Sequence, residues 1–372
     1  MTHSKQLFTK ISSQGMLEIS IKSAELPQPK AHEVIVKIEA SPINPSDMYP
    51  MFGPANLNEA SYNKETMTLS APVHKGLLPR IKSRLDMSLP IGNEGAGTVI
   101  AAGESDAAQA LVGKTVAVLS GACYAEYVCV PIQACLLHNE GTSAKAAASS
   151  FVNPLTALGM VATMRMEGHS ALVHTAAASN LGIMLNKICI AEGVSLVNIV
   201  RKQEQADMLA ALGAKHICNS SSDTFKKDLY HAIEETGATL AFDAIGGGEL
   251  VSDILTAMEM VGSKDTKGFN TYGSEANKQA YIYGGLDFSP TILNRAYGMT
   301  WGIGGWLLMR FLAKLSTQEV LALHKRVADE IDTTFKSDFT EVLSLEEVLS
   351  PDKIAQYNAK KTGEKFLVDP HK

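Results

Sequence analysis

The sequence has no apolar run long enough to cross a membrane. A membrane-spanning helix needs about 20 consecutive apolar residues, and the longest apolar stretch near the C-terminal third, residues 301–313, is interrupted by glycines and by Arg310. The N-terminal segment, MTHSKQLFTK, lacks the apolar core of a signal peptide. We therefore predict a protein that does not associate with membranes and lies in the cytoplasm.

Cysteines with the spacing of a metal site are also absent. None of the five cysteines forms a CxxC pair, and Cys123, Cys129 and Cys135 recur every six residues, whereas zinc knuckles use closer spacing. An odd number of scattered cysteines is typical of reduced thiols in a cytosol. We expect these side chains to be small apolar fillers of the interior.

An excess of positive charge is missing as well. Lys and Arg number 33 against 39 Asp and Glu, giving a formal net charge of -6, so no overall basic field attracts nucleic acid or anionic lipid. Hydrophobic residues make up 45% and charged residues 19%, a composition typical of folded proteins. The 372 residues are enough for two domains.

The first part of the chain has the pattern of short strands. Val34, Val36 and Ile38 alternate with Glu33, Ile35 and Lys37, which indicates a strand. Residues 96–130 contain similar strand patterns separated by glycine turns. Residues 54–90 are polar and basic instead, with Lys75, Arg80, Lys82 and Arg84, and are interpreted as a long loop or a small helical insertion.

From about residue 144 the pattern changes to alternating helices and strands. Residues 144–164 have the pattern of one helix, and later strands are predicted at 170–176, 195–200, 215–219, 239–247 and 280–286, with helices between the first four of them. This alternation predicts a parallel, doubly wound α/β sheet. Residues 262–279 are interpreted as a surface insertion, and the tail ends in a strand at 364–370.

A candidate phosphate-binding turn follows the first strand of this sheet. It includes Ser179, Asn180, Leu181 and Gly182, and Gly182 is the only glycine left of a GxGxxG pattern. The start of the next helix supplies N–H groups and a positive dipole end for a pyrophosphate. The alternative is an ordinary strand–turn–helix in which Ser179 or Asn180 is the N-cap.

The ends of the later strands carry further candidates. Arg201 and Lys202 stand where an NAD site usually has an acidic residue for the ribose, and two cations favour the 2′-phosphate of NADPH. The alternative is a pair of solvated loop charges. Gly246 and the pair Gly284 and Gly285 would let a flat ligand approach the backbone, or they form tight turns.

Taken in order, these pieces resemble the medium-chain dehydrogenase/reductase superfamily over nearly the whole chain. The closest subgroups by motif are the zinc-free NADPH:quinone oxidoreductases and the trans-2-enoyl thioester reductases. The motifs that carry the resemblance are HEVIVKIEASPINPSD (32–47), PIGNEGAGTV (90–99), FVNPLTALGMV (151–161), AAASNLG (176–182), FDAIGGG (242–248) and YIYGGL (281–286).

The resemblance implies the domain organisation. A GroES-like β-barrel catalytic domain would span residues 1–150 and be completed by residues 305–372. A Rossmann-type domain that binds NADPH would span residues 151–304. Relatives of this kind commonly form homodimers through the edges of their cofactor-domain sheets, and residues 301–306 would supply that edge.

The resemblance also implies that no metal is bound. Zinc-dependent relatives have a cysteine at the position of Asn44 and a histidine at the position of Asn93, and residues 144–160 contain no cysteine that could serve as the third ligand. Amides are poor zinc ligands beside thiolate and imidazole. Alcohol oxidation assisted by a metal ion is therefore not expected.

Site roles follow from the same resemblance. Asn44 and Thr156 would line the nicotinamide pocket, and the backbone of Gly284, Gly285 and Leu286 would hold the carboxamide. Ser179, Asn180, Leu181 and Gly182 would cover the pyrophosphate. Arg201 and Lys202 would bind the 2′-phosphate, and Gly246 would lie along the ribose.

A general acid is harder to find. Enoyl reductases use a tyrosine at a position where this chain has Ala55, and Tyr49 is a weak candidate out of register. Asp47 is expected to stabilise its loop, and His174 to be a packed residue and not a base. We therefore predict NADPH-dependent reduction of a quinone or activated alkene with solvent as the acid. The alternatives are an enoyl thioester (CoA or ACP) reductase and a cofactor-binding structural or regulatory protein with little turnover.

Overall fold

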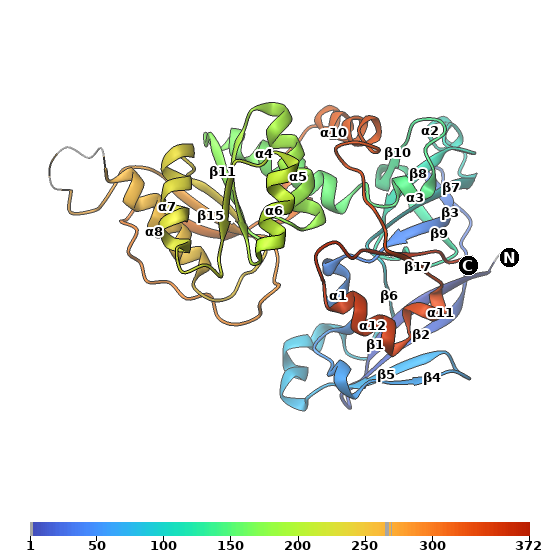
Figure 1. Cartoon of the computed structure of the whole chain (residues 1–372). Coiled ribbons are helices and arrows are strands. Elements are labelled where there is room, and N and C mark those ends of the chain that lie inside the picture. The colour runs from blue at the N-terminus through green and yellow to red at the C-terminus, as the bar shows by residue number, and fades with distance from the viewer. Residues whose placement is uncertain (1–2, 265–267, 269) are drawn as a thin grey trace. The chain divides into compact units, whose positions relative to one another are not determined.

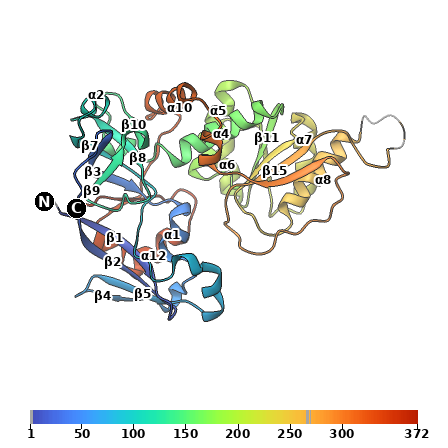
Figure 2. The same cartoon turned by 180° about the vertical axis from the view of Figure 1, so that it is seen from behind.

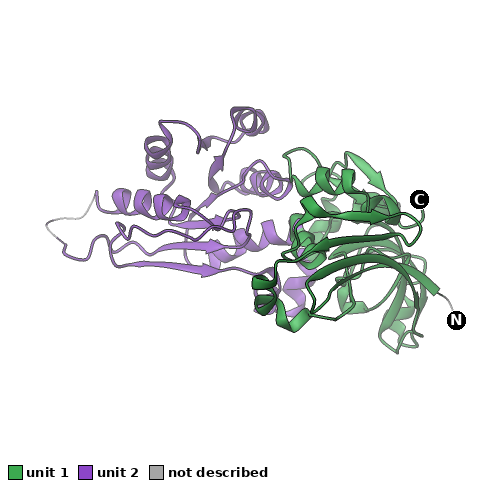
Figure 3. Cartoon of the chain, turned by 90° about the horizontal axis from the view of Figure 1, so that it is seen from below, with its two compact units in different colours: residues 1–152, 324–372 green, residues 153–323 purple. Residues whose placement is uncertain are grey.

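The structure is a computed structural model that describes residues 3–264, 268 and 270–372. It consists of two units of different architecture (Figure 3). Unit 1 consists of the residues up to Val152 together with His324–Lys372, and unit 2 of Asn153–Leu323. None of the described helices is long and apolar enough to cross a membrane.

Unit 1 contains two antiparallel-rich sheets. The first has the strand order β4-β5-β2-β1-β6, and Figures 1 and 2 show β4 and β5 beside β2. β1 and β2 pair antiparallel along their length, and Leu7, Leu17 and Ile19 are fully buried in its core. The strands are β1 (His3–Ile11), β2 (Met16–Glu25), β4 (Ser61–Asn63), β5 (Thr68–Pro72) and β6 (Leu89–Pro90).

The second sheet has the order β10-β8-β7-β3-β18-β17, and β9 pairs with β3. Val34, Val36 and Ile38 of β3 are fully buried, which confirms the predicted strand and its inner face. The C-terminal strand β18 pairs with the end of β3, so the last strand of the chain belongs to this sheet of unit 1. The strands are β3 (Glu33–Pro42), β7 (Glu94–Ala102), β8 (Thr115–Leu119), β9 (Tyr127–Pro131), β10 (Cys135–Leu137), β17 (Glu341–Leu343) and β18 (Phe366–Val368).

Short helices connect these strands. They are η1 (Pro45–Asp47), α1 (Met48–Phe52), η2 (Leu57–Glu59), η3 (Lys75–Arg84), α2 (Asp106–Gln109), η4 (Ile132–Ala134), α3 (Ala144–Ala147), α11 (Leu345–Val348) and α12 (Pro351–Asn358). Helix α10 (Thr317–Asp329) begins in unit 2 and ends in unit 1.

The segment 54–90 contains strands where a loop or a small helical insertion is predicted. β5 pairs with β2 from Thr68↔Ser20 to Pro72↔Met16, and β4 pairs with β5. The prediction is wrong for these strands because they are short and polar, and their pairing partner lies some fifty residues earlier in the chain. The 3-10 turns η2 and η3 account for the helical part of the prediction.

Unit 2 is a parallel six-stranded sheet with the order β13-β12-β11-β14-β15-β16. This is the order of a doubly wound sheet, with its switch point between β11 and β14, and it confirms the predicted α/β fold class. Figures 1 and 2 show α7 and α8 on one face of the sheet and α5 and α6 on the other. The strands are β11 (Ala171–His174), β12 (Ser195–Val200), β13 (His216–Asn219), β14 (Leu240–Asp243), β15 (Lys278–Ile282) and β16 (Trp301–Gly305).

The helices of unit 2 alternate with these strands along the chain. α5 and α6 each end at a left-handed glycine, Gly193 and Gly213, the usual helix stop. The helices are α4 (Val152–Met166), α5 (Asn180–Glu192), α6 (Gln203–Leu212), α7 (Phe225–Thr236), α8 (Leu250–Gly262) and α9 (Leu308–Leu312).

The single helix predicted for residues 144–164 is two helices, α3 and α4. Between them, the hydroxyl of Ser150 donates to the carbonyl of Ala147 at 2.6 Å. The buried carboxylate of Glu94 accepts the N–H groups of Phe151 and Val152 at 2.9 and 3.0 Å. A carboxylate that binds free N–H groups at a helix start favours a new helix there, so the prediction of one continuous helix is wrong.

The interpretation of residues 262–279 as a surface insertion holds only in part. Residues 265–267 and 269 lie outside the described residues, but Lys278 is fully buried. Its ammonium lies 2.7 Å from a carboxylate oxygen of Glu259 and donates to Ser274 at 2.9 Å. Charges are rarely buried unless paired in this way, which the sequence pattern does not reveal.

The chain returns to unit 1 at His324, later than the expected residue 305. Residues 301–312 stay with unit 2 because Trp306 packs there. Its ring lies edge-on to Phe242 at 5.8 Å, and its indole N–H donates to the Thr163 hydroxyl at 3.1 Å. β16 forms the outer edge of the sheet.

Candidate functional site

A short turn joins the end of β11 to the start of helix α5. Ser179 is the N-cap, and its hydroxyl accepts the Gly182 N–H at 3.1 Å. A Cβ on Gly182 would lie 2.1 Å from the carbonyl oxygen of Ala177, so only glycine fits there. The N–H of Leu181 donates no hydrogen bond within the described chain, which leaves a donor at the positive end of a thirteen-residue helix.

Ala176 adopts a conformation that usually requires glycine. Its φ is +50°, in the left-handed region that costs a residue with a Cβ about 1 kcal/mol. The turn therefore keeps an αL position although the first glycines of the common pattern are absent. Both interpretations of the turn remain compatible with this geometry, because an N-cap at Ser179 leaves the Leu181 N–H free.

The loop after β14 is held to the turn after β11 by Asp243 and Thr175. The Thr175 hydroxyl donates to Asp243 Oδ1 at 2.7 Å and accepts the Ala244 N–H at 2.8 Å. Asp243 also accepts the N–H groups of Ile245 and Gly246 at 3.0 and 2.8 Å. Sequence reasoning missed both residues. The signal was an aspartate just before a glycine-rich stretch, a typical Asx-turn pattern.

Gly246 and Gly284 shape the backbone beside that loop. Gly246 has a φ of +84°, and a Cβ on Gly284 would lie 2.8 Å from the Ala244 carbonyl oxygen. The N–H of Leu286 already donates to that carbonyl at 3.1 Å. Among the three residues expected to hold a carboxamide, only Gly284 and Gly285 have N–H groups without an acceptor in the described structure.

Arg201 and Lys202 follow β12 with exposed side chains. Their backbone N–H groups both donate to the side-chain oxygen of Gln205, at 3.0 and 3.2 Å, which fixes the turn into α6. Neither side chain forms an ion pair with another described residue. Two cations thus stand without a counter-charge at the carboxyl end of a strand next to β11.

A cavity of about 550 Å³ opens at the carboxyl ends of β13 and β14. Serines after β13 and glycines after β14 form much of its wall. The ion pair of Lys226 and Asp253, 2.8 Å apart, crosses between the starts of α7 and α8. No sequence signal indicated the serines. The lining residues are Ser220, Ser222, Asp223, Phe225, Lys226, Gly247, Gly248, Glu249, Leu250 and Asp253.

His174 and Tyr283 form a buried pair at the ends of β11 and β15. His174 Nε2 lies 2.7 Å from the Tyr283 hydroxyl, and the two rings stack with centroids 5.8 Å apart. Burial lowers the pKa of His174 to about 3 and raises the pKa of Tyr283. A neutral imidazole is expected at physiological pH, in keeping with the packed role predicted for His174.

Asn44 begins η1 in unit 1 and is 2% exposed. Its side-chain N–H donates to Glu94 Oε1 at 2.8 Å, while its Oδ1 is buried and has no partner. Asp47 accepts the backbone N–H groups of Asn44 and Asn93, both at 2.8 Å. Asp47 therefore ties the NPSD and GNEG segments together, the loop-stabilising role expected of it.

The buried position of Asp47 makes its carboxyl less acidic. Burial raises the pKa of Asp47 to about 7, against the lowering effect of the hydrogen bonds from Asn44 and Asn93, and the nearby charge of Glu94 adds to the rise. The side chain of Asn93 donates to the Ser46 hydroxyl at 3.0 Å. The side-chain amides of Asn44 and Asn93 thus both donate hydrogen bonds within unit 1.

Other expected site residues lie as follows. Thr156 is buried in α4, and its hydroxyl makes no hydrogen bond with a described residue. Tyr49 is on α1 with half of its surface exposed, and its carbonyl accepts Arg84 Nη1 at 3.2 Å. Arg84 also donates to the Pro50 carbonyl at 3.0 Å, so this cation is used within unit 1.

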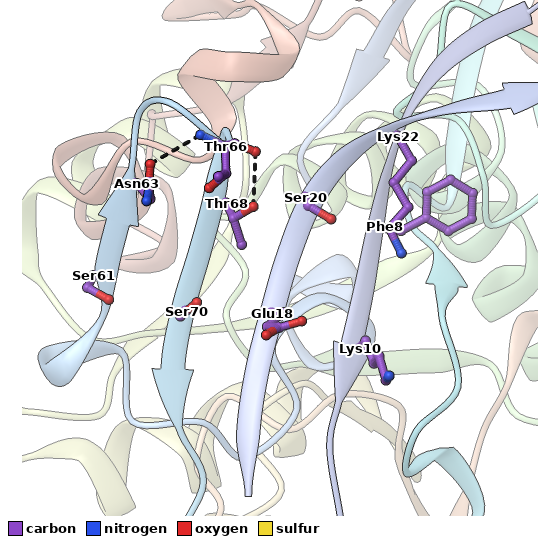
Figure 4. A pocket seen from close by; sticks show the side chains of 10 residues that line it. All are labelled: Phe8, Lys10, Glu18, Ser20, Lys22, Ser61, Asn63, Thr66, Thr68 and Ser70. Atoms are coloured by element: carbon purple, nitrogen blue, oxygen red, sulfur yellow. Dashed lines mark hydrogen bonds between the residues drawn. The ribbon is translucent and has the colours of Figure 1, made fainter.

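A second cavity, of about 380 Å³, lies on the first sheet of unit 1 (Figure 4). Cross-strand pairing places Lys10, Glu18, Ser70 and Ser61 in one row across it. None of the expected site residues lines this cavity or the cavity beside β13 and β14. The lining residues are Phe8, Lys10, Glu18, Ser20, Lys22, Ser61, Asn63, Thr66, Thr68 and Ser70.

Comparison with known proteins identifies the first unit directly. Residues 30–148 match the family described as the alcohol dehydrogenase GroES-like domain. A curated relative, "Probable quinone oxidoreductase" of Leishmania amazonensis, is 26% identical over 157 residues, which are 42% of this chain and 45% of the relative. The match thus spans less than half of that relative's length.

Solved structures match over the whole chain. A "putative NADPH:quinone reductase" of Mesorhizobium loti has a TM-score of 0.73 at 24% identity and covers 100% of both chains. Its counterpart from Bacillus thuringiensis has 0.74 at 18%, with 99% of each chain covered. A mutant enoyl thioester reductase from Candida tropicalis has 0.67 at 18%, covering 99% of this chain and 100% of its own. At these identities the likeness establishes the fold.

Unit 2 has the strand order of a doubly wound sheet, and unit 1 contains the GroES-like family match. Two solved structures align with both units together, from end to end of this chain. Unit 1 therefore contains an alcohol dehydrogenase GroES-like domain, and the whole chain has the fold of the solved structures with which it aligns.

Proposed function

We propose that this protein is an NADPH-dependent oxidoreductase that reduces a quinone or an activated alkene without a metal ion. The observation that carries the proposal is the pair Arg201 and Lys202, whose side chains have no counter-charge within the described structure. They follow β12, the strand beside the candidate phosphate-binding turn. Arginine offers planar paired donors to a phosphate.

The residues of unit 2 fit a dinucleotide in several respects. Leu181 has a free N–H at the start of α5, and with Ser179, Asn180 and Gly182 it would bind the pyrophosphate. Gly246 would lie along a ribose, while the free N–H groups of Gly284 and Gly285 would hold the carboxamide with Leu286 beside them. When bound, the cofactor supplies a hydride, and the protein's role is to bind and orient it.

The zinc-free part of the proposal rests on donor chemistry. Asn44 donates its side-chain N–H to Glu94, and Asn93 donates to Ser46. An amide nitrogen carries no lone pair for a metal, and amides are weak zinc ligands beside thiolate or imidazole. Asn44, with Thr156, is instead proposed to contact the nicotinamide end of the cofactor.

The proton for the reduced product is proposed to come from solvent. His174 is kept neutral by burial, and its Nε2 is engaged by Tyr283. Tyr49 is exposed, and its hydroxyl has no hydrogen-bond partner among the described residues, so it stays the one weak side-chain candidate. A quinone or activated alkene needs no strong general acid beside the hydride donor.

Reduction of an enoyl thioester is the second candidate. Structural likeness to an enoyl thioester reductase favours it, as do the exposed cations Lys75, Arg80 and Lys82, which could meet the phosphates of a CoA. Arg84 is not one of these cations, because its guanidinium donates to the carbonyls of Tyr49 and Pro50 on α1. A third possibility, a cofactor-binding regulatory or structural protein with little turnover, rests on the absence of a well-placed acid.

Steady-state oxidation of NADPH separates these candidates. We expect turnover with 9,10-phenanthrenequinone and simple enones, and little with crotonyl-CoA. A preference for crotonyl-CoA that falls in a combined Lys75, Arg80 and Lys82 to Ala variant would favour the thioester reductase. Tight NADPH binding with no acceptor oxidising it would favour the protein with little turnover.

A homodimer in the cytoplasm is proposed on separate grounds. β16 is an edge strand with three glycines and unpaired backbone on its outer side, and Leu307 and Met309 next to it are exposed. Open edges invite pairing with another strand. Sedimentation should give twice the chain mass of 39.8 kDa, and a monomer at micromolar concentration would contradict this assembly.

A further inference from the structure

The cavity of about 380 Å³ on the first sheet of unit 1 is formed by outward-facing positions of four paired strands (Figure 4). Cross-strand pairing arranges eight of its ten lining residues in two rows, each with one residue from β1, β2, β5 and β4. Neighbouring strands lie about 4.8 Å apart, so each row is about 14 Å long, and the rows are about 7 Å apart. The first row is Lys10, Glu18, Ser70 and Ser61, and the second is Phe8, Ser20, Thr68 and Asn63.

Many polar groups of this groove have no partner within the protein. Lys10 and Glu18 are direct cross-strand neighbours, yet among the described residues neither side chain forms an ion pair or a hydrogen bond. The hydroxyls of Ser20, Ser61 and Ser70 also lack a partner in the described part of the chain. Lys10, Ser20 and Ser70 are half-buried. The floor of the groove therefore offers a fixed pattern of donors and acceptors.

The two ends of the groove are polar as well. The ammonium of Lys22 lies 5.5 Å from the centre of the Phe8 ring and donates to the Ser88 hydroxyl at 2.9 Å. At the other end, Asn63 Oδ1 accepts the backbone N–H of Thr66 at 3.1 Å. The NH₂ of Asn63 has no acceptor among the described residues. Lys22 thus covers the one aromatic ring, and Asn63 adds a free donor.

The lining excludes several classes of ligand. Nine of the ten lining side chains are polar, so an apolar ligand would remove their water without replacing its hydrogen bonds. The carboxylate of Glu18 would repel a phosphate group. A peptide strand could not join the sheet from its face, because the backbones of these strands already pair with each other. An uncharged molecule with many hydroxyls fits, since each hydroxyl both donates and accepts.

We propose that this groove binds a short, uncharged oligosaccharide. Glu18 would accept hydrogen bonds from hydroxyls on adjacent sugar carbons with its two oxygens, and Lys10 and Asn63 would donate to other hydroxyls. A row of about 14 Å is longer than one sugar ring, so the ligand would span at least two sugars. β4 and β5 belong to the segment 54–90, which therefore supplies half of each row. The site lies within unit 1 and is independent of the proposed oxidoreductase function.

The test is a calorimetric titration of the full chain with three uncharged trisaccharides, maltotriose, cellotriose and mannotriose. We expect saturable binding of at least one of them, with a dissociation constant of about 1 mM or below. The absence of saturable binding of all three up to about 10 mM would overturn the proposal. Tighter binding of glucose 6-phosphate than of any trisaccharide would also overturn it, because that result identifies an anion site.

Glu18→Ala places the sugar in the groove, and Glu25→Ala is its matched control. Both carboxylates are exposed on β2, but Glu25 does not line the groove. Glu18→Ala should weaken trisaccharide binding at least about tenfold, because it removes the carboxylate acceptor. Glu25→Ala should change the dissociation constant by less than about twofold. Equal weakening in the two variants would contradict a site in this groove.

Ser70→Tyr fills the middle of the groove. Tyrosine is favourable at an outward-facing strand position, so the melting temperature should stay close to that of wild type while trisaccharide binding is lost. Any NADPH oxidation should be unchanged in Ser70→Tyr and Glu18→Ala, because neither residue belongs to the proposed cofactor site. A folded Ser70→Tyr variant that binds the trisaccharide as wild type does would overturn the proposal. If this variant does not fold, the comparison of Glu18→Ala with Glu25→Ala still decides.

Discussion

At the scale of single residues, the candidate phosphate-binding turn depends on two small side chains in unusual surroundings. Ala176 sits at a positive φ, and Gly182 lies where a Cβ would overlap the Ala177 carbonyl. Gly182 was predicted as the surviving member of the GxGxxG pattern. Ala176 could not be, because its conformation depends on the hydrogen bonds of Thr175 and Ala177 to neighbouring strands.

Gly182→Ala should destabilise unit 2. The added Cβ would lie 2.1 Å from the Ala177 carbonyl oxygen, so α5 has to move away from β11 at a cost of about 1–3 kcal/mol. Denaturant unfolding measures this loss, and NADPH binding should fall with it. Gly305→Ala is the control, since a Cβ there meets nothing within 4 Å. Equal stability of the two variants would contradict the close approach.

Asp47 gives the protein a pH-dependent stability. Its pKa is raised from 3.8 to about 7, chiefly by burial. Between these values the folded state keeps a proton that the unfolded state has released. The free energy of unfolding contributed by Asp47 therefore falls as the pH rises from about 4 to about 7.

The comparison with Asp47→Asn isolates that contribution. The variant loses hydrogen-bond capacity, which shifts its curve by a constant, but it lacks the titrating group and should have the flatter profile. Denaturant midpoints measured from pH 4 to pH 8 would show this. Parallel profiles for the two proteins would mean that Asp47 stays ionised in the fold.

At the scale of elements, patterning predicted the strands and helices that bury their own residues. The β3 alternation and the β11 to β15 succession are examples, because their apolar residues report burial directly. Elements that depend on distant partners were missed. β4 and β5 are polar strands that need β2, and the break between α3 and α4 is stabilised by Glu94, more than fifty residues earlier.

Arg84 shows the same dependence within the insertion. The sequence grouped it with Lys75, Arg80 and Lys82 as one of the basic residues of a loop or small helical insertion, whereas its guanidinium donates to the carbonyls of Tyr49 and Pro50 on α1. Its pKa is lowered by burial. No local pattern distinguishes it from Arg80, which is exposed.

Replacing Arg84 by Gln should therefore lower stability by about 1–2 kcal/mol, since the α1 carbonyls lose charged donors. Arg80→Gln should change stability by less than about 0.5 kcal/mol. Thermal unfolding of both variants tests the contrast. Matching melting temperatures would show that the α1 contacts of Arg84 add nothing in solution.

At the scale of the whole molecule, the chain leaves unit 1 once and returns to it once. The motifs predicted two domains and their kinds, since each motif belongs to one of them. The return point at His324 was harder to predict from the sequence. The packing of Trp306 against Phe242 and Phe311 keeps residues 301–312 in unit 2. Contacts between rings that lie far apart in the chain cannot be predicted from a local sequence pattern.

The candidate site follows the same division. Glycines and cations at strand ends could be predicted because the parallel sheet gathers those ends at one edge. The supporting residues Asp243, Thr175 and Glu94 could not, since their importance lies in hydrogen bonds across the fold. Arg201 and Lys202 are such strand-end cations, and the proposed preference for NADPH depends on them.

The most direct test is a titration of the native protein and of Arg201→Ala with NADPH and with NADH. We predict that wild type binds NADPH at least about tenfold more tightly than NADH. The variant should lose most of that preference while its affinity for NADH stays unchanged. Equal affinity for both nucleotides in wild type, or binding of neither, would contradict an NADPH-dependent enzyme.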